Sequence, residues 1–174
     1  MKNCWIRCSR IIIFYLLLLR VLRGEKIDSY PKTRNSRITV SGKIKMSVKK
    51  IVIADDSALA RMFIRRCLEI AGLGNSEYYD ANDGEDALQR LREVQADLLV
   101  TDLTMPNMNG VELLKRISAS PRLSGMPVLV VTSAGNEEQR RQLYELGVTR
   151  ILSKPISPPM LVEAIYEMFG NRVP

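Results

Sequence analysis

Acidic, hydroxyl and ammonium side chains stand directly at the ends of four short apolar runs in this sequence. These residues are Asp55, Asp56, Asp102, Thr132 and Lys154. A carboxylate at the end of a buried segment is costly unless a cation or hydrogen-bond donors accompany it. Carboxylates are also ligands that Mg²⁺ prefers, and an aspartate can act as a nucleophile that forms an aspartyl phosphate. The question is whether these side chains meet in one site for phosphoryl transfer.

Each of these residues also has a simpler structural explanation when it is taken alone. A helix cap accounts for the acidic pair before Ser57, and a turn accounts for Asp102. A β-branched residue such as Thr132 suits a strand, and a lysine such as Lys154 usually lies in solvent. Capping and solvation do not explain why all of them follow separate apolar runs, so their placement depends on the surrounding elements.

Short apolar runs and longer amphipathic segments alternate through residues 47–174. The runs predict five strands, at 51–54, about 77–81, 97–102, 128–132 and 150–153. Apolar residues at helical spacing predict a helix after each strand, beginning after Ser57, after Gly84 and at Gly110, and covering about 137–146 and about 158–169. In the first helix, Arg61, Arg65 and Arg66 fall mostly on the polar side, opposite the apolar residues.

This alternation predicts an α/β fold with a doubly wound, five-stranded parallel sheet of the flavodoxin-like type. The common strand order for five such strands is 2-1-3-4-5. Right-handed crossovers bring the carboxyl ends of parallel strands to one edge, where ligands of these folds bind. In this order the first and third strands are neighbours, so we expect Asp55, Asp56 and Asp102 to lie close together.

Three clustered carboxylates repel one another, because each like-charge pair about 4 Å apart costs on the order of 4 kcal/mol at an effective dielectric of 20. Either raised pKa values or a bound cation would relieve this repulsion. Mg²⁺ suits a site of carboxylate, water and phosphate oxygens. Lys154 adds a second positive charge on the same edge, and Thr132 adds a hydroxyl group. Such a set fits phosphoryl transfer with Asp102 as the attacking group, since that reaction depends on positioning and charge neutralisation.

Composition excludes other kinds of site. The chain contains no histidine, so it has no histidine general base, metal ligand or partner for a serine or cysteine nucleophile. Its 3 cysteines suggest neither a zinc site nor a disulfide framework, which fits a reducing cytoplasm. Residues 1–46 hold 11 basic and 2 acidic residues, whereas residues 47–174 hold 15 and 17. We therefore do not expect the second part to bind nucleic acid.

Residues 1–46 are treated apart from the domain predicted over 47–174. The nine apolar residues Ile11–Leu19 are too few to span a bilayer, which takes about 20 residues, and no small-residue cleavage site follows them. Residues 24–46 are polar, basic and aperiodic, which indicates disorder. Two interpretations stay open for residues 1–46. They are a disordered leader or upstream extension of the gene model, or else a membrane-surface anchor.

Four motifs resemble those of the receiver domain of two-component response regulators, and the likeness extends from about residue 49 to residue 169. They are "ADDS" at 54–57, "TDLTMPNMNG" at 101–110, "VVTS" at 130–133 and "SKP" at 153–155. The chain is most similar to the single-domain chemotaxis regulators of the CheY type. This resemblance implies a cytoplasmic signal-transduction protein that is a phospho-switch and not an enzyme, beyond self-phosphorylation and self-dephosphorylation.

The resemblance also implies a role for each site residue. Asp102 is expected to accept phosphate from a phosphohistidine of a sensor histidine kinase. Asp56, Asp102 and the backbone carbonyl of Thr104 are expected to ligate Mg²⁺ directly, with Asp55 acting through water. Thr132 and Lys154 are expected to contact phosphoryl oxygens, and the Lys154-Pro155 bond to be cis.

Ile151 departs from the family pattern, because many members carry an aromatic residue three positions before the conserved lysine. The resemblance therefore does not imply an aromatic side-chain rotation here, and switching without one stays open. The family's output surface corresponds to residues 137–169, and with no DNA-binding domain after it we expect a protein partner.

Four functional hypotheses remain to be distinguished. A chemotaxis-type switch is favoured, and a phosphorelay intermediate that passes phosphate to a histidine phosphotransferase is the alternative. A phosphatase of the haloacid dehalogenase type would need an aspartate where Thr104 stands. A phosphorylation-independent interaction module would not need the complete set of site residues.

Overall fold

The computed structural model describes residues 48–133 and 136–169, and the predictions for residues 1–46 lie outside them. The strands are β1 (Lys50–Ala54), β2 (Glu77–Ala81), β3 (Leu98–Thr101), β4 (Val128–Thr132) and β5 (Arg150–Ser153). The helices are α2 (Ala58–Leu68), the π-helix η1 (Glu69–Leu73), α3 (Gly84–Val94), α4 (Gly110–Ser118), α5 (Glu137–Glu145) and α6 (Pro158–Phe169). Each strand is followed by a helix, as the sequence predicts.

The five strands form one parallel sheet in the order β2-β1-β3-β4-β5, which confirms the predicted fold. Ala54 at the end of β1 is paired with Thr101 at the end of β3. Thr132 at the end of β4 is paired with Ser153 at the end of β5. The polar residues that follow these strands therefore emerge at one edge of the sheet.

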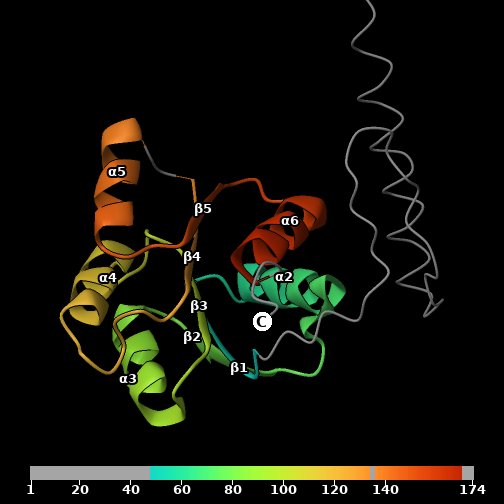
Figure 1. Cartoon of the computed structure of the whole chain (residues 1–174), viewed down its shortest axis with the longest axis horizontal. Coiled ribbons are helices and arrows are strands. Elements are labelled where there is room, and N and C mark those ends of the chain that lie inside the picture. The colour runs from blue at the N-terminus through green and yellow to red at the C-terminus, as the bar shows by residue number, and fades with distance from the viewer. Residues whose placement is uncertain (1–47, 134–135, 170–174) are drawn as a thin grey trace, which may run out of the picture. The chain divides into compact units, whose positions relative to one another are not determined.

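Helices cover both faces of the sheet. Helices α3, α4 and α5 lie on one face, and α2 and α6 lie on the other (Figure 1). Side chains alternate along the central strands, so that Leu99 and Val130 pack toward the first group of helices, whereas Val100 and Val131 pack toward the second. This burial on both faces explains why the strands read as continuous apolar runs.

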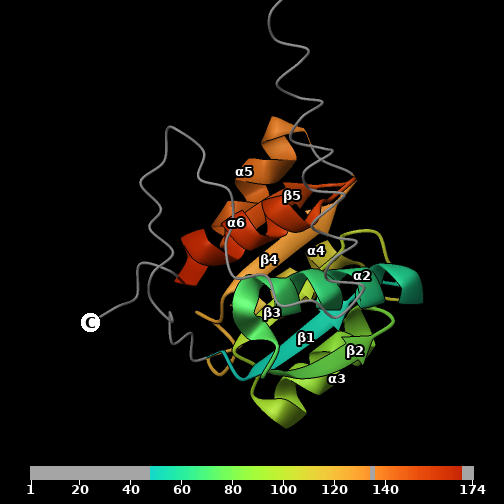
Figure 2. The ribbon, with the colours of Figure 1, turned by 90° about the vertical axis from the view of Figure 1, so that its right-hand side faces the viewer.

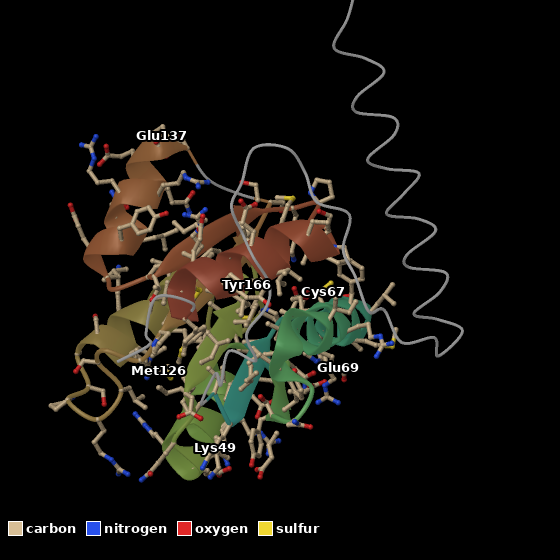
Figure 3. The ribbon with its side chains drawn as sticks, turned by 45° about the vertical axis from the view of Figure 1, so that its right-hand side comes forward. Lys49, Cys67, Glu69, Met126, Glu137 and Tyr166 are labelled. Atoms are coloured by element: carbon tan, nitrogen blue, oxygen red, sulfur yellow. The ribbon has the colours of Figure 1, made fainter. Side chains whose placement is uncertain are left out.

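Helices α2 and α6 pack side by side in front of the sheet (Figure 2). Figure 3 shows Cys67 of α2 and Tyr166 of α6 on these adjoining helices. Ser57 caps α2 by accepting a hydrogen bond from the backbone N–H of Ala60, and the chain leaves η1 at Gly72, whose φ of 99° favours glycine.

Arg61 does not lie on the solvent side of α2, where the helical pattern placed it. Its side chain is buried, because it points toward the backbone that links β1 to α2 instead of outward. A search of the described residues finds no helix with the length and apolar character needed to cross a membrane.

Candidate functional site

The ammonium group of Lys154 lies between two buried carboxylates. Lys154 Nζ donates to Asp102 Oδ2 at 2.5 Å and to Asp55 Oδ2 at 3.0 Å. Asp55 follows β1, Asp102 follows β3 and Lys154 follows β5, so the strand order brings together residues that lie up to 99 positions apart. One cation thus compensates two carboxylates that would otherwise repel each other.

Asp102 is held by its own loop as well as by the lysine. Its Oδ1 accepts hydrogen bonds from the backbone N–H of Leu103 at 2.6 Å and of Thr104 at 3.3 Å. Its backbone N–H donates to the carbonyl of Ala54 at 2.9 Å, which continues the ladder between β1 and β3. With 5% of its surface exposed, Asp102 is a buried carboxylate that can still be reached from the sheet edge. It therefore begins a turn and belongs to the charged cluster, so the two explanations considered for it are compatible.

Asp55 is more deeply buried than Asp102, and hydrogen bonds hold both its side chain and its backbone. Its Oδ1 accepts a hydrogen bond from the backbone N–H of Ser57 at 2.9 Å, and its backbone N–H donates to the carbonyl of Ala81 on β2. Its own carbonyl accepts a hydrogen bond from Arg61 Nη1 at 2.6 Å. The pattern of apolar residues gave no signal for this last contact, because a charged residue in a helix is expected to face solvent.

The pKa of Lys154 reflects two opposing effects. Burial lowers the pKa of the ammonium group, but the hydrogen bonds and charges of Asp102 and Asp55 raise it, and the net pKa lies above its ordinary value. The lysine therefore stays protonated at neutral pH. A permanent positive charge at this position suits an anion that is attached to Asp102 or approaches it.

Thr132 is linked to Lys154 by a hydrogen bond between their backbones. Its side chain is buried, and its carbonyl accepts a hydrogen bond from the backbone N–H of Lys154 at 2.8 Å. The Lys154-Pro155 peptide bond is cis, as the resemblance implied. Ile151 is buried among the apolar residues of β4 and α5, whereas Tyr144 on α5 is exposed.

Asp56 and Thr104 lie at the exposed rim of the site. Within the described residues, no three acidic, histidine or cysteine side chains are grouped closely enough to hold a metal ion. The structure therefore brings Asp55, Asp102 and Lys154 together and leaves Asp56 outside their network of hydrogen bonds.

The donor set nevertheless fits Mg²⁺. Asp55 and Asp102 present hard carboxylate oxygens that already meet around the positive charge of Lys154 Nζ, which occupies the place where a cation is electrostatically favoured. Asp56 directly follows Asp55 in the chain, and Thr104 lies two residues after Asp102, so both are close to these carboxylates in sequence. A hydrated divalent ion that is bound by one or two carboxylates needs no closed cage of protein ligands.

Two glycines and one side-chain pair anchor the loop that follows Asp102. Gly110 packs so tightly against this loop that a Cβ atom there would lie 2.2 Å from the carbonyl oxygen of Asp102. The backbone N–H of Gly84 donates to the carbonyl of Met108, and Asn107 Nδ2 donates to Asp83 Oδ2 at 2.7 Å. The turn residues of "NDG" and "NMNG" are a signal for these contacts, which were not among the predictions from the sequence.

Comparisons with known proteins agree with this geometry. The family model of the response regulator receiver domain matches residues 51–166. The chemotaxis protein CheY of Pseudomonas aeruginosa is 37% identical over 120 residues, which cover 69% of this chain and 95% of that protein. CheY-3 of Vibrio cholerae is 35% identical over 120 residues, covering 69% and 91%. A solved structure of the chemotaxis response regulator CheY4 of Vibrio cholerae has a TM-score of 0.63 at 27% identity, covering 71% of this chain and all of that one.

Proposed function

The chain belongs to the response regulator receiver domain family, and on this basis we propose that it is a phosphoacceptor switch whose Asp102 takes a phosphoryl group from a sensor histidine kinase. The observation that supports the proposal most is the ammonium group of Lys154 between Asp102 and Asp55. Receiver domains are phospho-switches and not enzymes in the usual sense. The activity proposed here is limited to self-phosphorylation and self-dephosphorylation.

The transfer begins with a carboxylate oxygen of Asp102 facing the phosphorus of a phosphohistidine. The bond between phosphorus and oxygen forms as the bond between phosphorus and nitrogen breaks, and the freed imidazole stays with the kinase. Leu103 and Thr104 hold Asp102 through their backbone N–H groups. Lys154 is proposed to pair with one phosphoryl oxygen, and the Thr132 hydroxyl group is proposed to bond another.

Receiver domains generally bind Mg²⁺, and the residues proposed to hold it here are Asp56, Asp102 and the carbonyl of Thr104, with Asp55 acting through water. When bound by these residues, the ion would supply positive charge to offset the negative charge on the phosphoryl oxygens. Asp55 keeps its hydrogen bond from the Ser57 backbone, so its position does not depend on Lys154 alone.

Phosphorylation adds about −1.5 to −2 charge at Asp102. We expect Lys154 and Thr132 to shift toward that charge and to bias a surface that has two conformations. The surface proposed for a downstream protein is residues 137–169, which corresponds to the output surface of the family. Lys154 lies within this range, between β5 and α6. The proposed location is the cytoplasm, where a kinase and a target of this kind meet.

Incubation of the full chain with acetyl phosphate and Mg²⁺, followed by intact-mass measurement, tests the proposal. The wild-type chain is expected to gain one phosphoryl group, and Asp102→Asn is expected to gain none. Equal gain by both proteins, or gain by neither, would contradict the phosphoacceptor role. Omitting Mg²⁺ should slow the reaction, which tests the ion separately.

A chemotaxis-type switch and a phosphorelay intermediate differ in what happens to the phosphoryl group. The first role, which the similarity to CheY proteins favours, requires phosphorylation-dependent binding to a flagellar switch protein. The second requires transfer from Asp102 to the histidine of a phosphotransferase. Mixing the phosphorylated chain with each class of protein separates the two roles.

A further inference from the structure

Arg61 is the only lysine or arginine that is buried in the part of the chain that the structure describes. It lies in the first turns of α2 with 9% of its surface exposed. Burying a guanidinium group is expensive unless its hydrogen bonds and charge are satisfied. The proposed phosphoryl transfer assigns no task to Arg61, so its contacts need an explanation of their own.

Two contacts satisfy the Arg61 guanidinium group. Nη1 donates to the backbone carbonyl of Asp55 at 2.6 Å, and Nε donates to Asp80 Oδ2 at 3.2 Å. Asp80 lies on the edge strand β2 and also accepts a hydrogen bond from Arg65 Nη2. Arg61 thus joins α2, the end of β1 and the end of β2 at the edge of the sheet that carries Asp102.

The carbonyl that Arg61 holds belongs to the peptide group between Asp55 and Asp56. Rotation of this peptide would turn both acidic residues relative to Asp102. We propose that Arg61 is a positioning residue that fixes this peptide and so orients Asp55 and Asp56 for a divalent cation. The inference rests on the proposed function, because that function supplies the cation.

A purely electrostatic role for Arg61 predicts the opposite effect on cation binding. A positive charge close to the acidic residues repels a divalent ion, so its removal would strengthen binding. A positioning role predicts that removal weakens binding, since the acidic residues lose their support. Asp80 compensates the charge of Arg61, which favours the positioning role.

Binding of Mn²⁺ as a probe, followed by electron paramagnetic resonance, distinguishes the two roles in the full chain. Arg61→Ala is expected to raise the Kd by about 10-fold, the usual effect of removing a residue that supports metal ligands. Arg61→Lys keeps the charge and one donor and should recover part of the affinity. Arg65→Ala is the matched control, because Arg65 shares Asp80 but contacts the carbonyl of Tyr78 instead of Asp55.

A second readout separates positioning from general damage to the fold. With acetyl phosphate as donor, Arg61→Ala should raise the Mg²⁺ concentration for half-maximal phosphorylation and leave the rate at saturating Mg²⁺ nearly unchanged. Circular dichroism and urea unfolding show whether each variant folds. If Arg61→Ala does not fold, Arg61→Lys is compared with Arg65→Ala instead.

Unchanged or tighter Mn²⁺ binding by folded Arg61→Ala would overturn the inference, and so would an equal loss in Arg65→Ala. Failure of the wild-type chain itself to bind Mn²⁺ would instead contradict the proposed function. The two failures are therefore distinguishable within one set of titrations.

Discussion

Lys154 pairs with the carboxylates of both Asp55 and Asp102, which lie side by side in a buried position. Removing one partner from a buried ion pair leaves an uncompensated charge, which costs more than the pair contributes. Here the loss of a single ammonium group would leave two carboxylates without compensation. The stability of this cluster therefore depends on the ammonium group of Lys154 or on another cation that takes its place.

Lys154→Met is expected to lower the free energy of unfolding by about 2 kcal/mol without divalent ions, less than for a fully buried pair because the lysine is partly exposed. Added Mg²⁺ should recover most of this loss, because the ion compensates the same carboxylates. Urea unfolding with and without Mg²⁺ measures both effects. Lys115→Met, at an exposed position of α4, should change little under either condition. Loss of stability that Mg²⁺ does not recover would contradict the assignment of the cation site.

Asp83 gives a prediction for the pH dependence of stability. Its pKa is lowered because its carboxylate accepts hydrogen bonds from the backbone N–H of Asp86 and from the side chain of Asn107. A lowered pKa means that the contribution to stability is present above the ordinary pKa of about 3.9 and is lost as the pH falls through the folded-state value.

Asp83→Ala should therefore cost about 1 kcal/mol near neutral pH, as expected for the loss of a helix cap. The difference between the variant and the wild-type chain should shrink as the pH falls below about 4. Urea unfolding as a function of pH measures this difference in the free energy of unfolding. A difference that stays constant down to pH 2 would show that the carboxylate charge is not involved.

At the scale of elements, the start of α4 fixes the loop that carries Asp102. The helix begins at Gly110, whose Cα lies against the backbone of Asp102 and Leu103 with no room for a side chain. Asn109 caps the helix by accepting a hydrogen bond from the backbone N–H of Glu112. A shift of this helix end would move Asp102, the proposed phosphoacceptor, directly.

Gly110→Ala is expected to destabilise the protein by about 3 kcal/mol, because the added methyl group meets backbone atoms that cannot move away independently. Phosphorylation by acetyl phosphate should slow as well, since Asp102 must shift. Gly74→Ala is the control, because the nearest atom to its added Cβ would be 3.9 Å away. Thermal unfolding and intact mass measure the two effects, and equal behaviour of the two variants would contradict this role for α4.

The strands were predictable because their residues are buried on both faces. The predicted bounds of β2, β4, β5 and α6 agree with the structure. The π-helix turn at the end of α2 and the burial of Arg61 were not predictable, since both depend on contacts with other elements. Helical periodicity identifies an apolar face, but it does not show that a charged residue will reach around the helix to a backbone carbonyl.

The candidate site was predictable to the extent that strand order determines it. An order of 2-1-3-4-5 is sufficient to place Asp55, Asp102 and Lys154 at one edge. Side-chain geometry is not contained in that order. The pairing of Lys154 with both buried carboxylates and the exposed position of Asp56 became visible only in the folded chain.

At the scale of the whole molecule, the basic excess lies in residues 1–46, whereas residues 47–174 are mildly acidic. The matched family region, the sheet and every proposed site residue fall in the second segment. We propose that this segment carries the complete switch. Removal of residues 1–46 should leave the free energy of unfolding and the rate of phosphorylation unchanged, as measured by urea unfolding and intact mass. A marked change in either would assign residues 1–46 a part in the switch.

The position of the phosphoryl group decides whether Asp102 is the phosphoacceptor. The chain is phosphorylated with acetyl phosphate and Mg²⁺, reduced with borohydride to convert the acyl phosphate into a stable alcohol, and mapped by peptide mass spectrometry. We expect reduction at Asp102 alone, with none at Asp55 or Asp56. Modification at another aspartate, with Asp102 unmodified, would contradict this role of Asp102.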